Sequence, residues 1–346
     1  MSSNVQTLDE NKLCRYLEAN QTNFKGPIVA TKFPGGQSNP TFKIESSVGE
    51  FVLRRQPPGK LLKSAHAVDR EYRVLEALAD TDVPVAEVYH LCEDPDVIGS
   101  MFYVMEYCDG NIHWSSSLEA LASNEQRGRC YDEMNRVLAA IHSVDLGKVG
   151  LLDYGKPGSY FQRQYDRWSA QYRSSELTVI LEMDELIGWL GKNVPEDDGR
   201  VSLVHGDYRL DNLMFTKDDS CIRAVLDWEL STLGHPYADL AYQCMGMRLP
   251  AKNAAGGSSS GLLGIDIAAL GIPTEEAYVQ TYSDRMGLGK IHNWNFYMAF
   301  SFFRLAAILQ GVARRAVDGN ASSEKAANMG KMVRPLATSG LSIING

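Results

Sequence analysis

The chain has 346 residues, of which 44% are hydrophobic and 22% are charged, and its formal net charge is −9. These proportions exclude global disorder and predict a soluble globular protein with a sizeable core, and the length suits two domains or lobes. The negative charge argues against a nucleic-acid binder that relies on a broad basic surface, but not against a phosphorylated ligand in a locally basic cleft.

The cysteines and the two most informative segments for targeting predict a cytoplasmic protein. The six cysteines lie far apart without a C-x-x-C pair, so neither a disulfide framework nor a zinc site is expected and a reducing cytosol is the simplest compartment. The N-terminus is polar, and we expect no secretory signal. The most apolar stretch, 296–313, contains Arg304 and Gln310, which favours a buried helix over a membrane span.

The first third of the chain predicts a small strand-rich lobe. Residues 8–17 have an amphipathic pattern, and residues 67–79 have the spacing of a helix. The other segments are short, rich in Val, Ile, Phe and Thr, and separated by turn residues, which is typical of antiparallel strands. The predicted strands are residues 28–33, 41–46, 50–55, 85–91 and 101–107.

The rest of the chain predicts a larger helical lobe, so the fold class is α+β. One strand-like island, residues 201–228, predicts a hairpin that carries two loops. The low-complexity segment 251–261 cannot build a core and predicts a mobile loop. The predicted helices are residues 117–123, 125–142, 159–173, 176–193, 236–247, 274–286 and 293–317.

The strand-like island also carries the strongest candidate site. His205-Gly206-Asp207 ends an apolar run, Asn212 follows five residues after Asp207, and Asp227 follows the next apolar run. Phosphoryl transfer to a hydroxyl needs a carboxylate that orients the hydroxyl and oxygen ligands for Mg²⁺. Asp207 would be the base, and Asn212 and Asp227 would hold the metal. The alternative is that these Asp and Asn side chains only form turns.

A second candidate lies between the first two predicted strands, in Gly35-Gly36-Gln37-Ser38-Asn39. Small residues there let backbone N–H groups approach phosphate oxygens, which makes Gly36, Ser38 and Asn39 candidate nucleotide contacts. The alternative is an ordinary hairpin turn. The segment is neither a G-x-G-x-x-G pattern nor a P-loop.

The catalytic segment resembles the aminoglycoside phosphotransferase family, which has a protein-kinase-like fold. His205, Asp207 and Asn212 match its H-x-D-x-x-x-x-N loop, and Asp227 matches its metal-binding Asp. The resemblance implies a bilobal fold with a small antiparallel-sheet N-lobe and a helical C-lobe. The implied boundaries are 1–105 for the nucleotide-binding lobe, 106–110 for the hinge and 111–346 for the C-terminal lobe with the acceptor site.

The same resemblance assigns roles on the third strand and the following helix. Arg54 stands where kinases have the Lys of V-A-I-K, and strand alternation puts Val52 on the same face, where it would cover the adenine. A guanidinium can bind phosphate oxygens as a fork, but whether Arg54 or Arg55 does so stays open. Glu71 matches the helix Glu that pairs with that cation. An ordinary surface ion pair is the alternative.

Further roles follow from the family pattern. The carbonyl of Glu106 and the N–H of Cys108 would bind the adenine edge through the backbone, and His205 would support the catalytic loop. Asp239 matches the Asp of the D-L-A motif, which also supports that loop. A plain role at the start of a helix is the alternative for Asp239.

Within this family the chain looks closest to the kinase-like domain fused to some acyl-CoA dehydrogenases. The segments that suggest this are FVLRRQPPGKLLKSAHAVDREYRVLEAL, LVHGDYRLDNLMF, AVLDWELSTLGHPYADLAY and FYMAFSFFRLAAILQGVARRA. Acceptors implied by that subgroup include hydroxyacyl chains carried on CoA, whereas the family name refers to polycationic sugars.

One charged side chain in the last predicted helix bears on this choice. Arg304 is the only charged residue between Trp294 and Ala313, and it shares a helical face with Arg315. A buried guanidinium needs an anion from the protein or from a ligand. If a ligand supplies it, Arg304 and Arg315 would line the acceptor pocket and favour an acidic acceptor; an internal carboxylate is the alternative.

We therefore expect an ATP- and Mg²⁺-dependent O-phosphotransferase that acts on a hydroxyl of a small molecule, such as a hydroxyacyl-CoA or hydroxy acid. An aminoglycoside kinase, an amino-alcohol (choline-type) kinase and a nucleotide-binding pseudokinase are the alternatives. A metal-dependent phosphohydrolase would need more metal ligands than this segment offers. Neither nucleic acid nor membrane is an expected partner, and the oligomeric state and the choice of ATP over GTP stay open.

Overall fold

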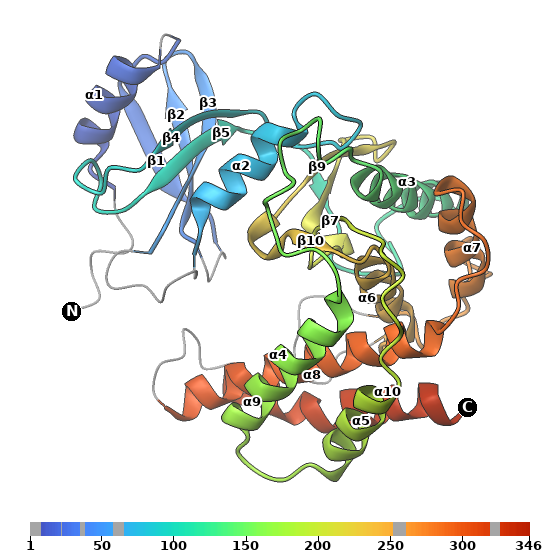
Figure 1. The fold of residues 1–346 in the computed structure, drawn as a ribbon. Helices are drawn as coiled ribbons and strands as arrows, with labels where there is room; N and C mark the ends of the chain where they lie inside the picture. The colour runs from blue at the N-terminus through green and yellow to red at the C-terminus, as the bar shows by residue number, and fades with distance from the viewer. Residues whose placement is uncertain (1–7, 22, 35–38, 58–65, 252–260, 319–325) are drawn as a thin grey trace.

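A computed structural model of the chain describes residues 8–21, 23–34, 39–57, 66–251, 261–318 and 326–346. Its first part is a five-stranded antiparallel sheet in the order β1-β2-β3-β5-β4, with α1 (Glu10–Asn20) on one face and α2 (Val68–Leu78) on the other (Figure 1). Leu13 and Leu17 of α1 pack on the sheet, as the amphipathic pattern predicts. The strands are β1 (Ile28–Lys32), β2 (Thr41–Ser46), β3 (Gly49–Arg55), β4 (Val88–Cys92) and β5 (Phe102–Glu106).

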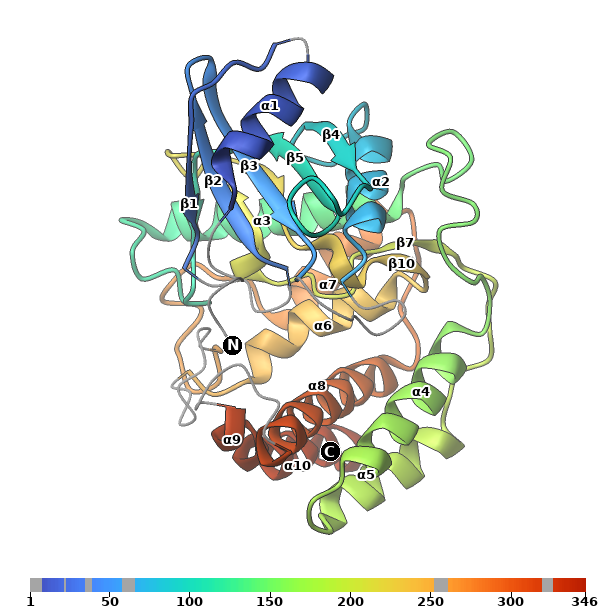
Figure 2. The same ribbon diagram turned by 90° about the vertical axis from the view of Figure 1, so that its left-hand side faces the viewer.

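The second part is mainly helical and holds two small sheets next to the first part (Figures 1 and 2). One sheet has the order β6-β8-β9 and the other pairs β7 with β10. Its strands are β6 (Asn111–Ile112), β7 (Ser202–Val204), β8 (Leu213–Phe215), β9 (Ile222–Val225) and β10 (Thr232–Gly234). Its helices are α3 (Asn124–His142), α4 (Tyr160–Ser175), α5 (Leu181–Lys192), α6 (Tyr237–Arg248), α7 (Glu275–Arg285), α8 (Trp294–Val317), α9 (Ala326–Met329) and α10 (Val333–Asn345). The bilobal α+β fold is thus confirmed.

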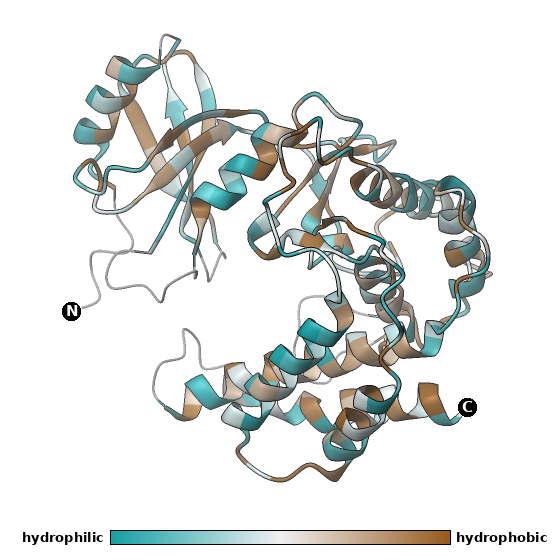
Figure 3. Cartoon of the chain, viewed as in Figure 1, coloured by the Kyte–Doolittle hydropathy of each residue, from teal (hydrophilic) through white to brown (hydrophobic). Residues whose placement is uncertain are grey.

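The long helix α8 is the centre of the helical part. By length and composition it is the one helix of the described chain that is apolar enough to cross a membrane, yet 78% of its most apolar window is buried inside the protein. It packs against α4, α6 and α10, and Phe302 and Phe303 are fully buried. The expected buried helix is therefore confirmed. Helix α3 at the outer side is amphipathic, with hydrophilic and hydrophobic flanks (Figure 3).

Some predicted elements are wrong. Residues 117–123 form turns instead of a helix, because Leu118 adopts a left-handed backbone (φ 50°) and the extended Ser123 caps the start of α3. The segment 176–193 is helical only from Leu181, and α10 was not predicted. The loop predicted at 251–261 lies almost wholly outside the described residues.

The strand-like island is also more complex than one hairpin. Strands β8 and β9 do form a hairpin, but β7 pairs with β10, whose partner residues Val204 and Thr232 are far apart in the sequence. After β7 the chain therefore leaves the β7–β10 sheet, forms β8 and β9 of the three-stranded sheet, and returns to the β7–β10 sheet as β10. This arrangement brings the two loops that carry Asp207 and Asp227 to neighbouring strand ends.

Candidate active site

The loop after β7 is held in place by the side chain of His205. This ring is fully buried, its Nε2 lies 2.9 Å from the carbonyl oxygen of Leu226, and its Nδ1 accepts from the N–H of Asp207 at 3.2 Å. Because Nδ1 is an acceptor, Nε2 carries the proton and donates to Leu226. His205 therefore ties the Asp207 loop to the residue just before Asp227.

Asp239 of α6 holds the same loop from beneath. Its carboxylate is fully buried and accepts from the backbone N–H groups of His205 at 2.6 Å and Gly206 at 2.9 Å. Burial alone would raise the pKa of this carboxyl, but hydrogen bonds from His142 and the loop lower it below its usual value. The carboxylate thus stays ionised, as a buried acceptor of several donors should.

The loop geometry requires glycine at position 206. Gly206 has φ 84°, in the left-handed region, and a Cβ added there would lie 2.6 Å from the backbone oxygen of Leu230. A side chain at this position would therefore push the loop away from the segment that follows Asp227.

Asp207 and Asn212 contact each other directly. The amide Nδ2 of Asn212 donates to the backbone oxygen of Asp207 at 2.9 Å and to its Oδ2 at 3.0 Å. Burial raises the pKa of Asp207 above its ordinary value, although Arg209, His205 and Arg304 act in the opposite direction. The neighbouring side chain of Tyr242 also acts to lower the pKa of Asp207. A carboxylate with a raised pKa is a stronger proton acceptor.

Asp227 joins the two lobes through Arg54. Asp227 follows β9 with a left-handed backbone (φ 64°), and its Oδ1 lies 2.7 Å from Nη2 of Arg54 on β3. Nε of Arg54 donates to Oε2 of Glu71 at 2.8 Å. Oε2 of Glu229 lies 3.6 Å from Nη2 of Arg54. Glu71 is only 2% exposed, so the Arg54–Glu71 contact is not an ordinary surface ion pair.

Arg55 faces away from this cluster. Its Nη1 donates to the carbonyl oxygen of Ile98 at 3.2 Å, and its guanidinium lies 5.6 Å from the centre of the Phe42 ring. Neighbouring residues of a strand point to opposite faces, which explains the difference. Of the two arginines, the structure places Arg54 beside Asp227.

The cluster carries more negative than positive charge. Three carboxylates, those of Glu71, Asp227 and Glu229, surround the one guanidinium of Arg54. Burial raises the pKa of Glu71 to about 7, and the two other carboxylates add to this rise while Arg54 opposes it. A divalent cation at Asp227 would offset this excess.

The donor atoms suit magnesium bound together with a phosphate. Nδ2 of Asn212 is engaged with Asp207, which leaves its oxygen, and Asp227 adds a carboxylate. Within the described residues, no group of three His, Cys, Asp or Glu side chains could hold a metal ion. Mg²⁺ is commonly held by one or two protein oxygens plus substrate phosphates, so the residues fit such an ion.

The other predicted nucleotide contacts are only partly described. Gly36 and Ser38 lie outside the described residues. Asn39 is buried, with Oδ1 3.1 Å from Nδ1 of His66, and its Nδ2 has no partner in the described part of the chain. Val52 is buried on β3, on the same face as Arg54.

The segment that connects the lobes, residues 106–110, takes part in a small buried apolar cluster. Cys108 packs with Ala86 and Ala224, and burial raises the pKa of its thiol to about 11. The side chain of Glu106 pairs with Arg223 of β9, while its backbone N–H donates to the carbonyl of Glu87 at 2.8 Å. The thiol of Cys108 is therefore neutral, and its surroundings suit an apolar ring.

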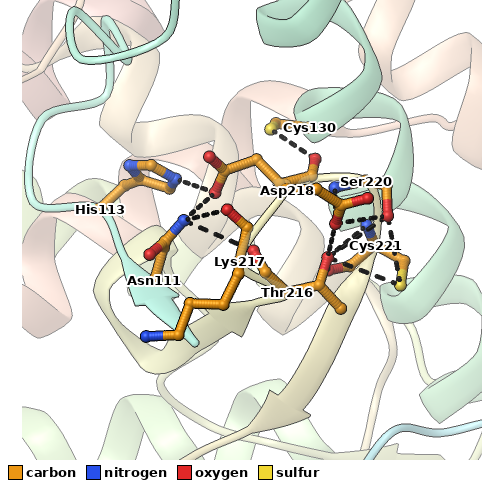
Figure 4. A network of polar contacts seen from close by, with 9 residues as sticks. Asn111, His113, Cys130, Thr216, Lys217, Asp218, Ser220 and Cys221 are labelled. Atoms are coloured by element: carbon orange, nitrogen blue, oxygen red, sulfur yellow. Dashed lines mark hydrogen bonds and ion pairs between the residues drawn. The ribbon is translucent and has the colours of Figure 1, made fainter. Parts of the chain in front are cut away.

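A polar network fixes the far end of this connection. His113 and Asn111 of the segment around β6 contact Oδ1 of Asp219 at 2.8 Å and 3.1 Å, and Cys130 of α3 contacts its backbone oxygen (Figure 4). Asp219 lies in the turn between β8 and β9. The network therefore fastens the start of the second lobe to the hairpin that carries the site.

The two arginines expected in an acceptor pocket have other surroundings. Nη2 of Arg304 donates to the backbone oxygen of Gly206 at 2.6 Å, and among the described residues no carboxylate forms an ion pair with it. Arg315 is exposed. A backbone carbonyl thus takes the place of the internal carboxylate that was the alternative for Arg304, and neither arginine lines the cavity described next.

An apolar cavity of about 270 Å³ lies beside the catalytic loop. Arg209 and Asp211 of the loop, joined through Nε and Oδ1 at 2.5 Å, line its polar side together with Tyr242. These three were missed from the sequence, although Arg209 and Asp211 follow Asp207 within four residues. The apolar lining comes from α3, α6, α8 and the segment 329–336, and includes Met134, Met245, Met247, Leu305, Leu309, Met329 and Met332.

Two curated proteins with acyl-CoA dehydrogenase names are similar to this chain in sequence. The chain is 48% identical over 91% of its length to mouse acyl-CoA dehydrogenase family member 10, and 42% identical over 97% to the Arabidopsis thaliana protein described as probable acyl-CoA dehydrogenase IBR3. It spans only 29% and 43% of those proteins, respectively.

Solved structures show the same fold. A Ralstonia eutropha protein described as an aminoglycoside phosphotransferase is 47% identical, with a TM-score of 0.88 over 98% of this chain and 99% of that one. Aminoglycoside phosphotransferase APH(4)-Ia, in a complex with ADP and hygromycin B, is 16% identical with a TM-score of 0.60 over 96% and 98%. A model of the phosphotransferase enzyme family matches residues 29–264. The chain therefore belongs to the phosphotransferase enzyme family.

Proposed function

We propose that this protein is an ATP- and Mg²⁺-dependent O-phosphotransferase that acts on a hydroxyl group of a small molecule. The observation that carries the proposal is the junction of the lobes, where Arg54 lies 2.7 Å from Asp227 while Asp207 and Asn212 contact each other on the adjacent loop. Phosphoryl transfer needs little more than such a set of positioned charges.

Each residue then has a defined task. Asp207 orients the acceptor hydroxyl and accepts its proton, and its raised pKa suits that task. Asn212 and Asp227 hold Mg²⁺, which when bound neutralises charge on the phosphates. Arg54, held by Glu71, contacts phosphate oxygens with its guanidinium.

The nucleotide would lie between the lobes. Val52 and the apolar group around Cys108 offer a surface for the adenine ring, and the backbone of Glu106 and Cys108 offers its edge a carbonyl and an N–H. The complex of APH(4)-Ia with ADP supports the use of an adenine nucleotide by this fold.

The cavity favours an acceptor with an apolar chain. Methionine and leucine side chains dominate its lining, and Asp211, the acidic residue among those that line it, is already paired with Arg209. A polycationic sugar would need unpaired carboxylates. The similarity to acyl-CoA dehydrogenase family members adds support for a hydroxyacyl-CoA or related hydroxy acid.

A direct test incubates the protein with ATP, Mg²⁺ and a panel of hydroxyacyl-CoAs, hydroxy acids, aminoglycosides and amino alcohols. The readout is the mass gain of one phosphate on the acceptor, because ADP release alone does not separate transfer from hydrolysis. We expect transfer to a hydroxyacyl compound. Transfer only to a polycationic sugar or to an amino alcohol would contradict the acceptor class, and no transfer to any hydroxyl would favour a nucleotide-binding protein.

The assignment of Asp207 is tested on the acceptor found in this way. Asp207→Asn removes the proton acceptor and should lower kcat by about 10²–10⁴-fold while ATP binding persists. Asp218→Asn, an exposed change in the turn between β8 and β9, should leave kcat unchanged. Full turnover by Asp207→Asn would show that another group is the base.

A further inference from the structure

Arg304 is held in a closed environment in the middle of α8. It is 9% exposed, and its guanidinium lies 5.6 Å from the ring centre of Trp168 and 5.1 Å from that of Tyr242. Aromatic faces attract a guanidinium and shield it from water. Burial of this charge costs free energy, so we expect the hydrogen bond that the guanidinium makes to serve the site as well as the packing of the helix.

That contact fixes one particular peptide unit. Nη2 of Arg304 donates to the carbonyl oxygen of Gly206, which belongs to the peptide bond that enters Asp207. The N–H of the same peptide bond, on Asp207, donates to Nδ1 of His205. Because a peptide unit is planar, contacts at both of its ends define the plane from which the Asp207 side chain emerges.

Tyr242 completes the arrangement. Its ring lies beside the guanidinium of Arg304, with 5.1 Å between the guanidinium carbon and the ring centre. A ring from α6 therefore holds Arg304 of α8 in place, while Arg304 holds the peptide that enters Asp207.

The helix that carries Arg304 also lines the acceptor cavity. Leu305 and Leu309 of α8 face that cavity, whereas Arg304 does not line it. One helix thus contacts the space for the acceptor and the loop that carries the base. Arg304 is suited to align the two rather than to bind the acceptor itself.

We propose that Arg304 is a positioning residue, which fixes the Gly206–Asp207 peptide through its carbonyl and so holds the Asp207 carboxylate in line with the acceptor hydroxyl. The inference rests on the proposed function, because it assigns Asp207 as the base. It adds to the site a residue of α8 that lies 98 residues after Gly206 in the sequence.

Two variants separate positioning from simple stabilisation. Arg304→Met removes the donor but keeps a long apolar side chain, and misplacement of a reacting group should lower kcat by about 10²-fold while KM for ATP is unchanged. Arg304→Lys keeps a donor without the planar fork and should recover part of kcat. Arg314→Met is the matched control, because Arg314 lies on the same helix and pairs with Asp318.

A second measurement does not depend on activity. Hydrogen exchange followed by mass spectrometry should show faster exchange for the peptide that contains residues 203–210 in Arg304→Met, and wild-type exchange there in Arg314→Met. ATP binding by calorimetry and the melting temperature establish that each variant is folded. If the wild-type protein phosphorylates no acceptor, the proposed function fails, while the exchange result still reports on the positioning.

Two outcomes would overturn the inference. One is a folded Arg304→Met variant with wild-type kcat and wild-type exchange in the loop. The other is an equal loss of ATP affinity and kcat with no recovery in Arg304→Lys, which would make Arg304 a general structural residue.

Discussion

Asp239 organises the catalytic loop although it touches neither of the proposed reactants. Its buried carboxylate accepts two backbone N–H groups of the loop, and Nε2 of His142 lies 3.4 Å away. Burial would raise its pKa, but these contacts outweigh burial and lower it. Such a carboxyl stabilises the folded protein at pH values above its pKa in the unfolded chain, which is about 3.9. This stabilisation is lost as the pH falls through the lower pKa that the group has in the folded protein.

Asp239→Asn should therefore destabilise the protein in a pH-dependent way. We expect a loss of about 3–5 kcal/mol of unfolding free energy at pH 7, because an amide cannot replace the charge that the loop donors need. The difference from wild type should shrink in acid, since wild type then loses the same charge. Urea unfolding at several pH values measures this; Asp166→Asn, an exposed change, is the control. A difference that is constant with pH would contradict the role of the charge.

At the scale of elements, α2 is clamped to the second lobe. Arg70 donates to the carbonyl of Tyr154 at 2.7 Å and lies 4.2 Å from the centre of its ring, and the Tyr154 hydroxyl contacts Oγ of Ser231 at 2.7 Å. Ser231 lies four residues after Asp227. Helix α2 also carries Glu71. The contacts of Arg70 with Tyr154 therefore help to keep the ion pairs of Arg54 with Glu71 and Asp227 together.

We predict that Arg70→Met weakens nucleotide binding more than it weakens the chemical step. Hydrogen bonds to charged groups contribute about 1.5–3 kcal/mol, so KM for ATP should rise about tenfold or more when α2 loosens. Arg129→Met on the exposed side of α3 should leave it unchanged. Steady-state kinetics with varied ATP give the answer, and an unchanged KM in Arg70→Met would show that α2 does not need this clamp.

For the whole molecule, the site consists of groups from both lobes. Arg54 and Glu71 come from the first lobe, and Asp227 comes from the second. A ligand that binds only this assembled state stabilises the protein by mass action, by about 2.7 kcal/mol at a concentration of 100 times Kd.

ATP should therefore raise the melting temperature more with Mg²⁺ than with a chelator. The reason is that Asp227 and Glu229 hold excess negative charge, which opposes binding of the triphosphate unless a cation offsets it. Asp227→Asn should lose the magnesium-dependent part of the shift, and Asp218→Asn should keep it. Differential scanning fluorimetry compares them; equal shifts with and without Mg²⁺ would argue against the metal site.

The sequence alone determined what depends on local spacing. The five-residue step from Asp207 to Asn212 brings the two side chains into contact within one loop. Strand alternation puts Arg54 and Arg55 on opposite faces, but only the structure shows that Arg54 is the one beside Asp227. Strong periodicity likewise predicted the first-lobe strands and α8, since burial of one face needs no knowledge of the partner.

Tertiary structure decided the rest, because it depends on contacts between distant segments. The sequence shows that Arg304 needs a partner, but only the packed structure selects the carbonyl of Gly206 over a carboxylate. The pairing of β7 with β10 and the turns at 117–123, where helical spacing is overridden by buried Leu118 in a left-handed conformation, have the same origin. The sequence pattern shows which buried polar groups need a partner. Only the packed fold determines which atom becomes that partner.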